Sequence, residues 1–148
     1  MLETVLDLKD LFNEKGYRYT AQREKILDIL KQQSAKHLTA VDICVLVKKK
    51  YPKIGVATVY RTLSIFEKLN MIQKLGPDNE LNRYEFNTSH DDHEHNHLIC
   101  IKCGMVKDIK ENVMGEMSKN ILKNHNFVVN GFNQKLYGIC EDCLMKDM

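Results

Sequence analysis

The stretch ATVYRTLSIFEKL, residues 57–69, decides the fold of this chain. Val59, Leu63 and Phe66 recur at the spacing of one helix face, whereas Arg61 and Ser64 fall on the opposite face. The pattern predicts an amphipathic helix that packs through its apolar side. Its polar side stays free to contact a partner.

Two short runs of strand-forming residues follow this helix, at 71–75 and 82–86. The sequence Gly-Pro-Asp-Asn at 76–79 separates them and is typical of a turn. A helix followed directly by a hairpin predicts the recognition helix and wing of a winged helix-turn-helix domain.

Three further helices are expected upstream of residue 52. Gly16 ends the first, Thr20 caps the second, and Thr39 with Asp42 forms a capping box that opens the third. Their apolar stripes are Val5, Leu8 and Phe12; Ile26, Leu27 and Leu30; and Ile43, Leu46 and Val47.

The composition changes abruptly after Phe86, where a polar run at 87–92 predicts a linker or a metal-rich loop. We therefore expect a winged-helix domain at 1–86 and a small α/β domain at 87–148, which gives an α+β fold class. The second domain should have strands at 98–101, 105–109, 127–129 and 136–139. Its helix should carry the apolar stripe Met114, Met117, Ile121 and Leu122.

Composition and charge narrow the function. The chain has 148 residues, 43% of them apolar and 28% charged, which suits a globular protein. Residues 1–84 carry 15 Lys and Arg against 10 Asp and Glu, and residues 85–148 carry 7 against 10. The basic half suits phosphates and the acidic half suits cations, and an ordinary solvated surface is the alternative explanation for such modest excesses. With no apolar run of about 18 residues and no leader-like start, a soluble, cytoplasmic protein is expected.

Two Cys-x-x-Cys pairs, Cys100 with Cys103 and Cys140 with Cys143, can place four thiolates on one ion. Such a closed tetrahedral site prefers zinc and is structural, because no coordination position remains for a substrate. Redox dithiols and unrelated thiols are the alternatives. Cys44, by contrast, falls on the packed side of an expected helix and should be a buried structural thiol.

Four histidines, His90, His93, His95 and His97, lie within eight residues of one another. Alternation in an extended strand would place the last three on one face. Imidazoles gathered on one face can bind a metal ion, although a histidine-rich loop can also be an unselective metal buffer.

His37 and Glu85 are the candidates from the first domain to complete a site with His95 and His97. Nitrogen and oxygen ligands suit Fe(II), Mn(II), Co(II) or Zn(II). A metal held by both domains would fix the angle between them and shift the population toward a DNA-competent shape.

The exposed face of the 57–69 helix supplies candidate DNA contacts. Arg61 can bind guanine edges or phosphate, Thr58 and Ser64 can bond either, and Tyr60 can contact a thymine methyl. Arg18 could enter the minor groove. The alternative is an ordinary solvated helix face.

At these motifs the sequence resembles the ferric uptake regulator family over nearly its whole length. The matching stretches are Gly16 to Thr20 with Gln22 and Arg23, His37 to Ala40, Gly55 to Leu63, Arg83 to Glu85, His95 to Cys100, and Tyr137 to Cys140.

The resemblance implies a homodimeric repressor that binds an A·T-rich inverted repeat. It also implies structural zinc on the four paired cysteines and a regulatory metal on His37, Glu85, His95 and His97. Glu85 is the residue that iron sensors of the family carry. Asp108, however, stands where peroxide sensors supply a further carboxylate ligand.

A third metal site found in many iron sensors is not expected, because Phe132 and Asn96 replace two of its usual residues. A site rebuilt around His93, Glu94, Glu116 or His125 is the alternative.

The sequence therefore predicts a Fe(II)-responsive repressor of iron acquisition, with Mn(II) or Zn(II) as alternative regulatory metals. A peroxide-sensing or zinc-sensing repressor of the same family is the alternative. A metalloenzyme and a metal buffer represent other classes; an enzyme is not expected, because no nucleophile with an adjacent base is visible.

Overall fold

The computed structural model describes residues 5–33, 36–76, 79, 81–87, 96–110, 114–130 and 134–147. The chain divides into two compact units, Met1–Ser89 and His90–Met148. Within the described residues, no helix combines the length and apolar character needed to cross a membrane.

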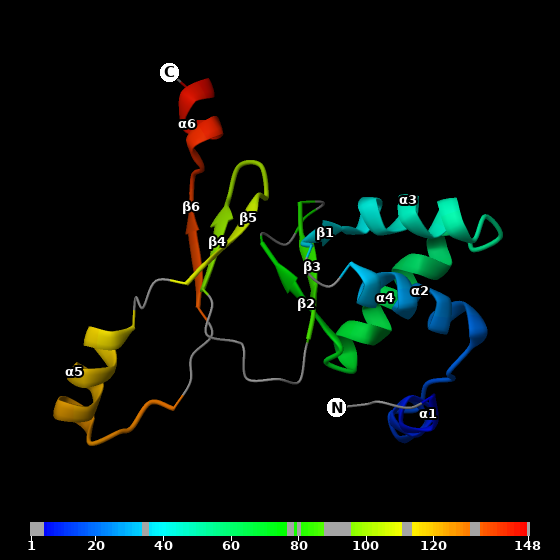
Figure 1. Cartoon of the computed structure of the whole chain (residues 1–148), viewed down its shortest axis with the longest axis horizontal. Helices are drawn as coiled ribbons and strands as arrows, with labels where there is room; N and C mark the ends of the chain where they lie inside the picture. The colour runs from blue at the N-terminus through cyan, green and yellow to red at the C-terminus, as the bar shows by residue number, and fades with distance from the viewer. Residues whose placement is uncertain are drawn as a thin grey trace. The chain divides into compact units, whose positions relative to one another are not determined.

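The first unit has the four helices and the hairpin that the sequence predicts (Figure 1). The helices are α1 (Val5–Glu14), α2 (Ala21–Gln32), α3 (Ala40–Lys50) and α4 (Val56–Lys68). The hairpin strands are β2 (Ile72–Leu75) and β3 (Arg83–Phe86). A two-residue strand that was not expected, β1 (Leu38–Thr39), pairs with β3 and completes a sheet in the order β1-β3-β2.

Local chemistry sets where these helices begin and end. Gly16, just beyond α1, adopts a φ of 80°, which favours glycine over residues with a Cβ. The Thr20 side chain accepts from the Arg23 backbone N–H, and Thr39 and Asp42 form a reciprocal capping box at α3. The predicted caps are thus confirmed.

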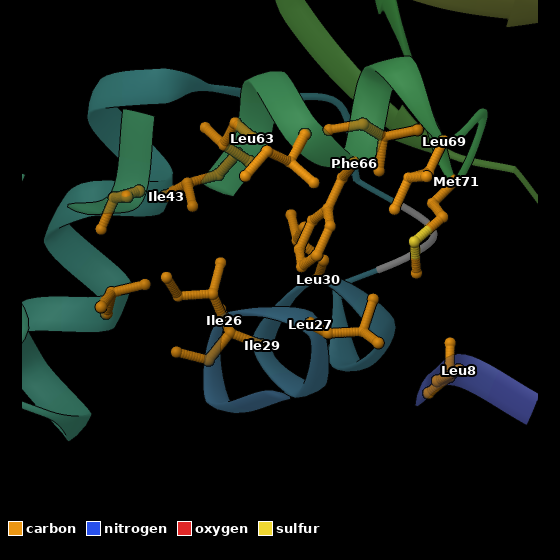
Figure 2. Close-up of a cluster of buried hydrophobic side chains, with 14 of the residues drawn as sticks. Leu8, Ile26, Leu27, Ile29, Leu30, Ile43, Leu63, Phe66, Leu69 and Met71 are labelled. Atoms are coloured by element: carbon orange, nitrogen blue, oxygen red, sulfur yellow. The ribbon is translucent and has the colours of Figure 1, made fainter. Parts of the chain in front are cut away.

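The core of the first unit forms where α4 packs on the other helices. Phe66 of α4 is fully buried and points toward α2, where Leu27 and Leu30 lie (Figure 2). It also meets Phe12 of α1 edge to face, with ring centroids 6.1 Å apart. This packing buries the apolar face of α4 and leaves Arg61 and Ser64 exposed.

The second unit is built on a three-stranded sheet. Strand β4 (Asn96–Cys100) lies between β5 (Val106–Ile109), which is antiparallel to it, and β6 (Lys135–Gly138), which is parallel. Helix α5 (Gly115–His125) lies between β5 and β6 in sequence, and α6 (Glu141–Lys146), which was not expected, follows β6.

One expectation for the second unit is wrong. Residues 127–129 form no strand; Phe127 and Val128 are instead largely exposed. The expected helix is present as α5, and its apolar stripe is mostly exposed: Met117 is 52% exposed and Leu122 49% exposed, whereas Met114, at the N-cap, is buried. Within the described residues, no other part of the chain buries these apolar side chains of α5 and of the segment after it.

The packing of α4 predicts the effect of truncating its central aromatic ring. Phe66→Ala should lower the free energy of unfolding by about 3 to 5 kcal/mol, because it removes a fully buried ring and leaves a cavity. Urea denaturation followed by circular dichroism measures this change. Leu6→Ala, at a side chain that is 71% exposed, is the matched control and should change stability little.

Candidate functional site

Four cysteines of the second unit form one compact cluster. Cys100 ends β4, Cys103 follows in the next turn, and Cys140 and Cys143 lie at the start of α6. Parallel pairing of β4 with β6 places Cys100 opposite Gly138 and so brings the two Cys-x-x-Cys pairs together. All four Sγ atoms lie within 4.8 Å of one another.

The spacing of these sulfurs fits a tetrahedral zinc ion. Zn–S bonds of about 2.3 Å place the sulfurs of a regular tetrahedron about 3.8 Å apart. The Sγ atoms of Cys100 and Cys143 are 3.8 Å apart, and those of Cys103 and Cys140 are 3.7 Å apart. The cluster therefore suits a closed, structural zinc ion.

The surroundings shift the pKa values of two of these thiols in opposite directions. The backbone N–H of Cys140 donates to Cys100 Sγ at 3.4 Å and is the main reason that the pKa of Cys100 falls to about 6. A hydrogen bond with Cys140, together with burial and the other sulfurs, raises the pKa of Cys143 to about 12. Four neighbouring sulfurs cannot all become thiolates without a compensating positive charge, which a zinc ion provides.

In the first unit, the wing brings His37 and Glu85 together. Strand β1 pairs Leu38 with Tyr84, which places the residues that flank this pair, His37 and Glu85, at the same end of the ladder. His37 Nε2 lies 3.5 Å from Glu85 Oε1, and both side chains are about nine-tenths buried, with exposed fractions of 14% and 13%. Arg83 donates to the His37 backbone carbonyl at 2.9 Å and holds this segment in place. The pair offers one nitrogen and one oxygen ligand at a spacing suited to a first-row metal ion.

In the second unit, His97 and Asp108 form a corresponding pair on neighbouring strands. The two residues are directly opposite in the β4–β5 ladder, and His97 Nδ1 lies 2.8 Å from Asp108 Oδ1. His97 is 2% exposed, whereas the Asp108 side chain is 41% exposed. Asp108 can orient the His97 ring by accepting a hydrogen bond from Nδ1, which leaves Nε2 to bind a metal ion. The same spacing is equally compatible with Asp108 binding the ion itself.

The remaining residues considered for metal binding lie outside the two histidine–carboxylate pairs. His90, His93, Glu94, His95 and Phe132 lie outside the described residues, so their predicted arrangement stays a prediction. Asn96 is fully buried, whereas Glu116 and His125 are exposed on α5. Among the described residues, neither of these two belongs to a cluster of metal-ligating groups.

The structure places the predicted DNA contacts on an exposed surface of the first unit. Tyr60, Arg61 and Ser64 of α4 are exposed, and Thr58 is half-buried near the start of the helix. Arg18 is also exposed, in the turn before α2, where its carbonyl accepts a hydrogen bond from the Arg23 guanidinium. Cys44, expected to be a buried structural thiol, packs against the core and is half-buried, and this burial raises the pKa of its thiol.

One residue near the histidine–carboxylate pair was missed by the sequence analysis. Gln73 of β2 donates from Nε2 to Glu85 Oε2 at 2.7 Å. Only the β2–β3 register, which pairs Gln73 with Glu85, could have revealed it, and that register depends on a hairpin whose turn the sequence does not fix.

The sequence profile of the ferric uptake regulator family matches residues 14–137 of the chain. The chain belongs to the ferric uptake regulator family. As a member of this family it is a metal-responsive transcriptional repressor, and family regulators are transcription factors rather than enzymes.

Relatives within the family include both iron and peroxide regulators. The chain is 33% identical to the ferric uptake regulation protein of Bacillus subtilis over 140 residues, which cover 95% of the chain and 94% of that protein. It is 33% identical to the peroxide-responsive repressor PerR of Staphylococcus epidermidis over 128 residues, covering 86% and 82%. The solved structure of the ferric uptake regulator from Francisella tularensis with iron aligns with a TM-score of 0.66 at 30% identity, covering 87% and 96%.

The cysteine cluster yields a prediction with an internal control. Cys103→Ser should abolish zinc retention and lower the melting temperature of the second unit, because it removes one of four ligands. Cys44→Ser removes a thiol outside the cluster and should retain one zinc per chain. Metal analysis after dialysis and thermal unfolding give the two readouts. Equal zinc content in both variants would contradict the assignment.

Proposed function

We propose that this family member is a cytoplasmic Fe(II)-responsive repressor of iron-acquisition genes, active as a homodimer on an A·T-rich inverted repeat. The observation that carries the proposal is the pair formed by Glu85 of the wing and His37, the residue before β1, which lie 3.5 Å apart and are largely buried. A metal ligand set built into the wing couples metal occupancy directly to the DNA-binding domain. Glu85 is also the residue that iron sensors of the family place here.

The regulatory ion needs more ligands than the wing supplies. Fe(II) and related ions bind four to six donor atoms, and His37 with Glu85 provides two. We propose that His95, His97 and Asp108 of the second domain provide the others. Metal binding would then favour one arrangement of the domains, in which the DNA-binding helices of a dimer match the spacing of the operator.

Homodimerisation through the second domain is supported by its uncovered apolar side chains. A small domain rarely exposes this many large apolar residues unless a partner covers them. They are spread over α5, the segment after it, β6 and α6: Met117, Leu122, Phe127, Val128, Tyr137, Leu144 and Met145. We infer that a second copy of this chain covers them.

For DNA binding we propose α4 as the recognition helix. Arg61 would contact guanine edges or phosphate, Thr58 and Ser64 would bond bases or phosphates, and Tyr60 would contact thymine methyl groups. Arg18 would reach the minor groove. The exposed positions of these side chains support this assignment, apart from Thr58, which is half-buried.

A peroxide sensor is the second candidate, and Asp108 favours it. Its carboxylate lies 2.8 Å from His97 and stands where peroxide sensors have a further ligand. In such a sensor, peroxide and bound Fe(II) would oxidise His37 or His95 and release DNA. A zinc-sensing repressor is a third candidate, with the same ligands and a different physiological metal.

The assignment of α4 predicts the effect of removing its arginine. Arg61→Ala should weaken operator binding by at least tenfold and leave the content of structural zinc unchanged, because the side chain is exposed and remote from the cysteines in sequence. Fluorescence anisotropy on an inverted-repeat duplex measures the loss. Lys123→Ala, which removes an equal charge from α5, should bind like the unmodified protein. Full binding by Arg61→Ala would exclude Arg61 as a DNA contact and leave the assignment of α4 without its main basic residue.

The regulatory site predicts how metal controls binding. Anaerobic Fe(II) should switch on DNA binding by the unmodified protein, whereas Glu85→Ala should need far more Fe(II), because it loses a ligand. Mn(II) and Zn(II) titrations compare the alternative metals. Peroxide challenge followed by mass spectrometry separates the sensors: an unmodified His37 peptide supports the iron repressor, and a gain of one oxygen at His37 or His95 with loss of DNA binding supports the peroxide sensor. If no metal promotes binding, the repressor mechanism proposed here is wrong.

A further inference from the structure

The two carboxylate oxygens of Glu85 have different neighbours. Oε1 lies 3.5 Å from His37 Nε2, and Oε2 accepts the hydrogen bond from Gln73 Nε2 at 2.7 Å. The Glu85 side chain is 13% exposed, so protein groups, among them these two neighbours, orient it more than bulk water does. One oxygen therefore faces the candidate metal ligand, and the other is engaged by an amide.

The backbone fixes the Gln73 contact. Gln73 and Glu85 are directly opposite in the antiparallel β2–β3 ladder, between the pairs formed by Ile72 with Phe86 and Lys74 with Tyr84. Side chains of directly opposite residues project from the same face of a sheet. The neighbouring Lys74 projects from the other face, where it pairs with Glu67 at 3.5 Å. Gln73 thus reaches Glu85 without any rearrangement of the wing.

The chemistry of the donor matters as much as its position. A glutamine amide is neutral, so it occupies an oxygen of Glu85 without neutralising the charge that attracts a cation. A lysine or arginine at the same place would compete with the metal for the carboxylate. A carboxylate can bind an ion through one oxygen or through both. Binding through both oxygens is typical of larger ions with flexible coordination, and it requires both oxygens to be available.

We propose that Gln73 is a positioning residue that makes Glu85 a one-oxygen ligand and thereby sets the affinity and metal preference of the regulatory site. The inference rests on the proposed regulatory metal. Hydrogen-bond partners of metal ligands commonly change metal affinity by about ten- to hundredfold when they are lost. Without the amide, Glu85 can turn away from His37 or offer both oxygens to the ion.

Cobalt(II) titration of the full-length, zinc-loaded protein tests the proposal. Co(II) is a suitable probe because the intensity of its visible bands falls as the coordination number rises. Gln73→Leu, which keeps the bulk of the side chain and removes the amide, should raise the Kd for Co(II) by about ten- to hundredfold and change these bands. Lys74→Gln, on the opposite face of the same strand, is the matched control and should change neither. A folding defect would instead lower the melting temperature of the variant before Co(II) is added.

Two ligand variants separate failure of this inference from failure of the proposed function. If Glu85→Ala and His37→Ala bind Co(II) as the unmodified protein does, there is no regulatory ion at the wing, and both proposals are overturned. If these variants lose Co(II) and Gln73→Leu keeps the unmodified affinity and bands, the regulatory site stands and the role of Gln73 is overturned.

Discussion

The first unit depends on the burial of one face of α4. Phe66 packs against Phe12 and toward α2, and this contact fixes the rotation of α4 about its own axis. Because a helix has 3.6 residues per turn, fixing the buried face also fixes where Arg61 and Ser64 point. The core interaction thus presents a particular set of polar side chains to solvent.

The wing continues from the same packing. Met71 follows α4 and is buried in the core, so the hairpin leaves the helix at a fixed place. The β2–β3 register then sets Gln73 opposite Glu85, and β1 brings the backbone of His37 to Arg83. Hydrophobic packing several residues away therefore sets the positions of the candidate metal ligands in this unit.

Features encoded by neighbouring residues could be predicted from the sequence. The capping box of Thr39 and Asp42 spans three residues, and the apolar stripe of α4 spans less than three turns. Features that depend on distant partners could not be predicted. Strand β1 exists because Leu38 meets Tyr84, and Gln73 matters because of its register with Glu85. Residues 127–129 show the opposite failure: their apolar character indicated a strand, but Phe127 and Val128 are largely exposed, and apolar side chains on a surface can equally belong to an interface.

The parallel pairing of β4 with β6 has a consequence for how the second unit is made. Parallel strands require a long crossover, and here β5 and α5 lie between the two strands. Cys100 and Cys103 are therefore synthesised well before Cys140 and Cys143, and the sheet and the metal site are both completed by contacts of high sequence separation. During that interval the first two thiols are a partial site that can be oxidised or can bind a competing soft metal. The four-cysteine site is therefore complete only after β6 has paired with β4, so the last strand of the sheet and the last two zinc ligands arrive together.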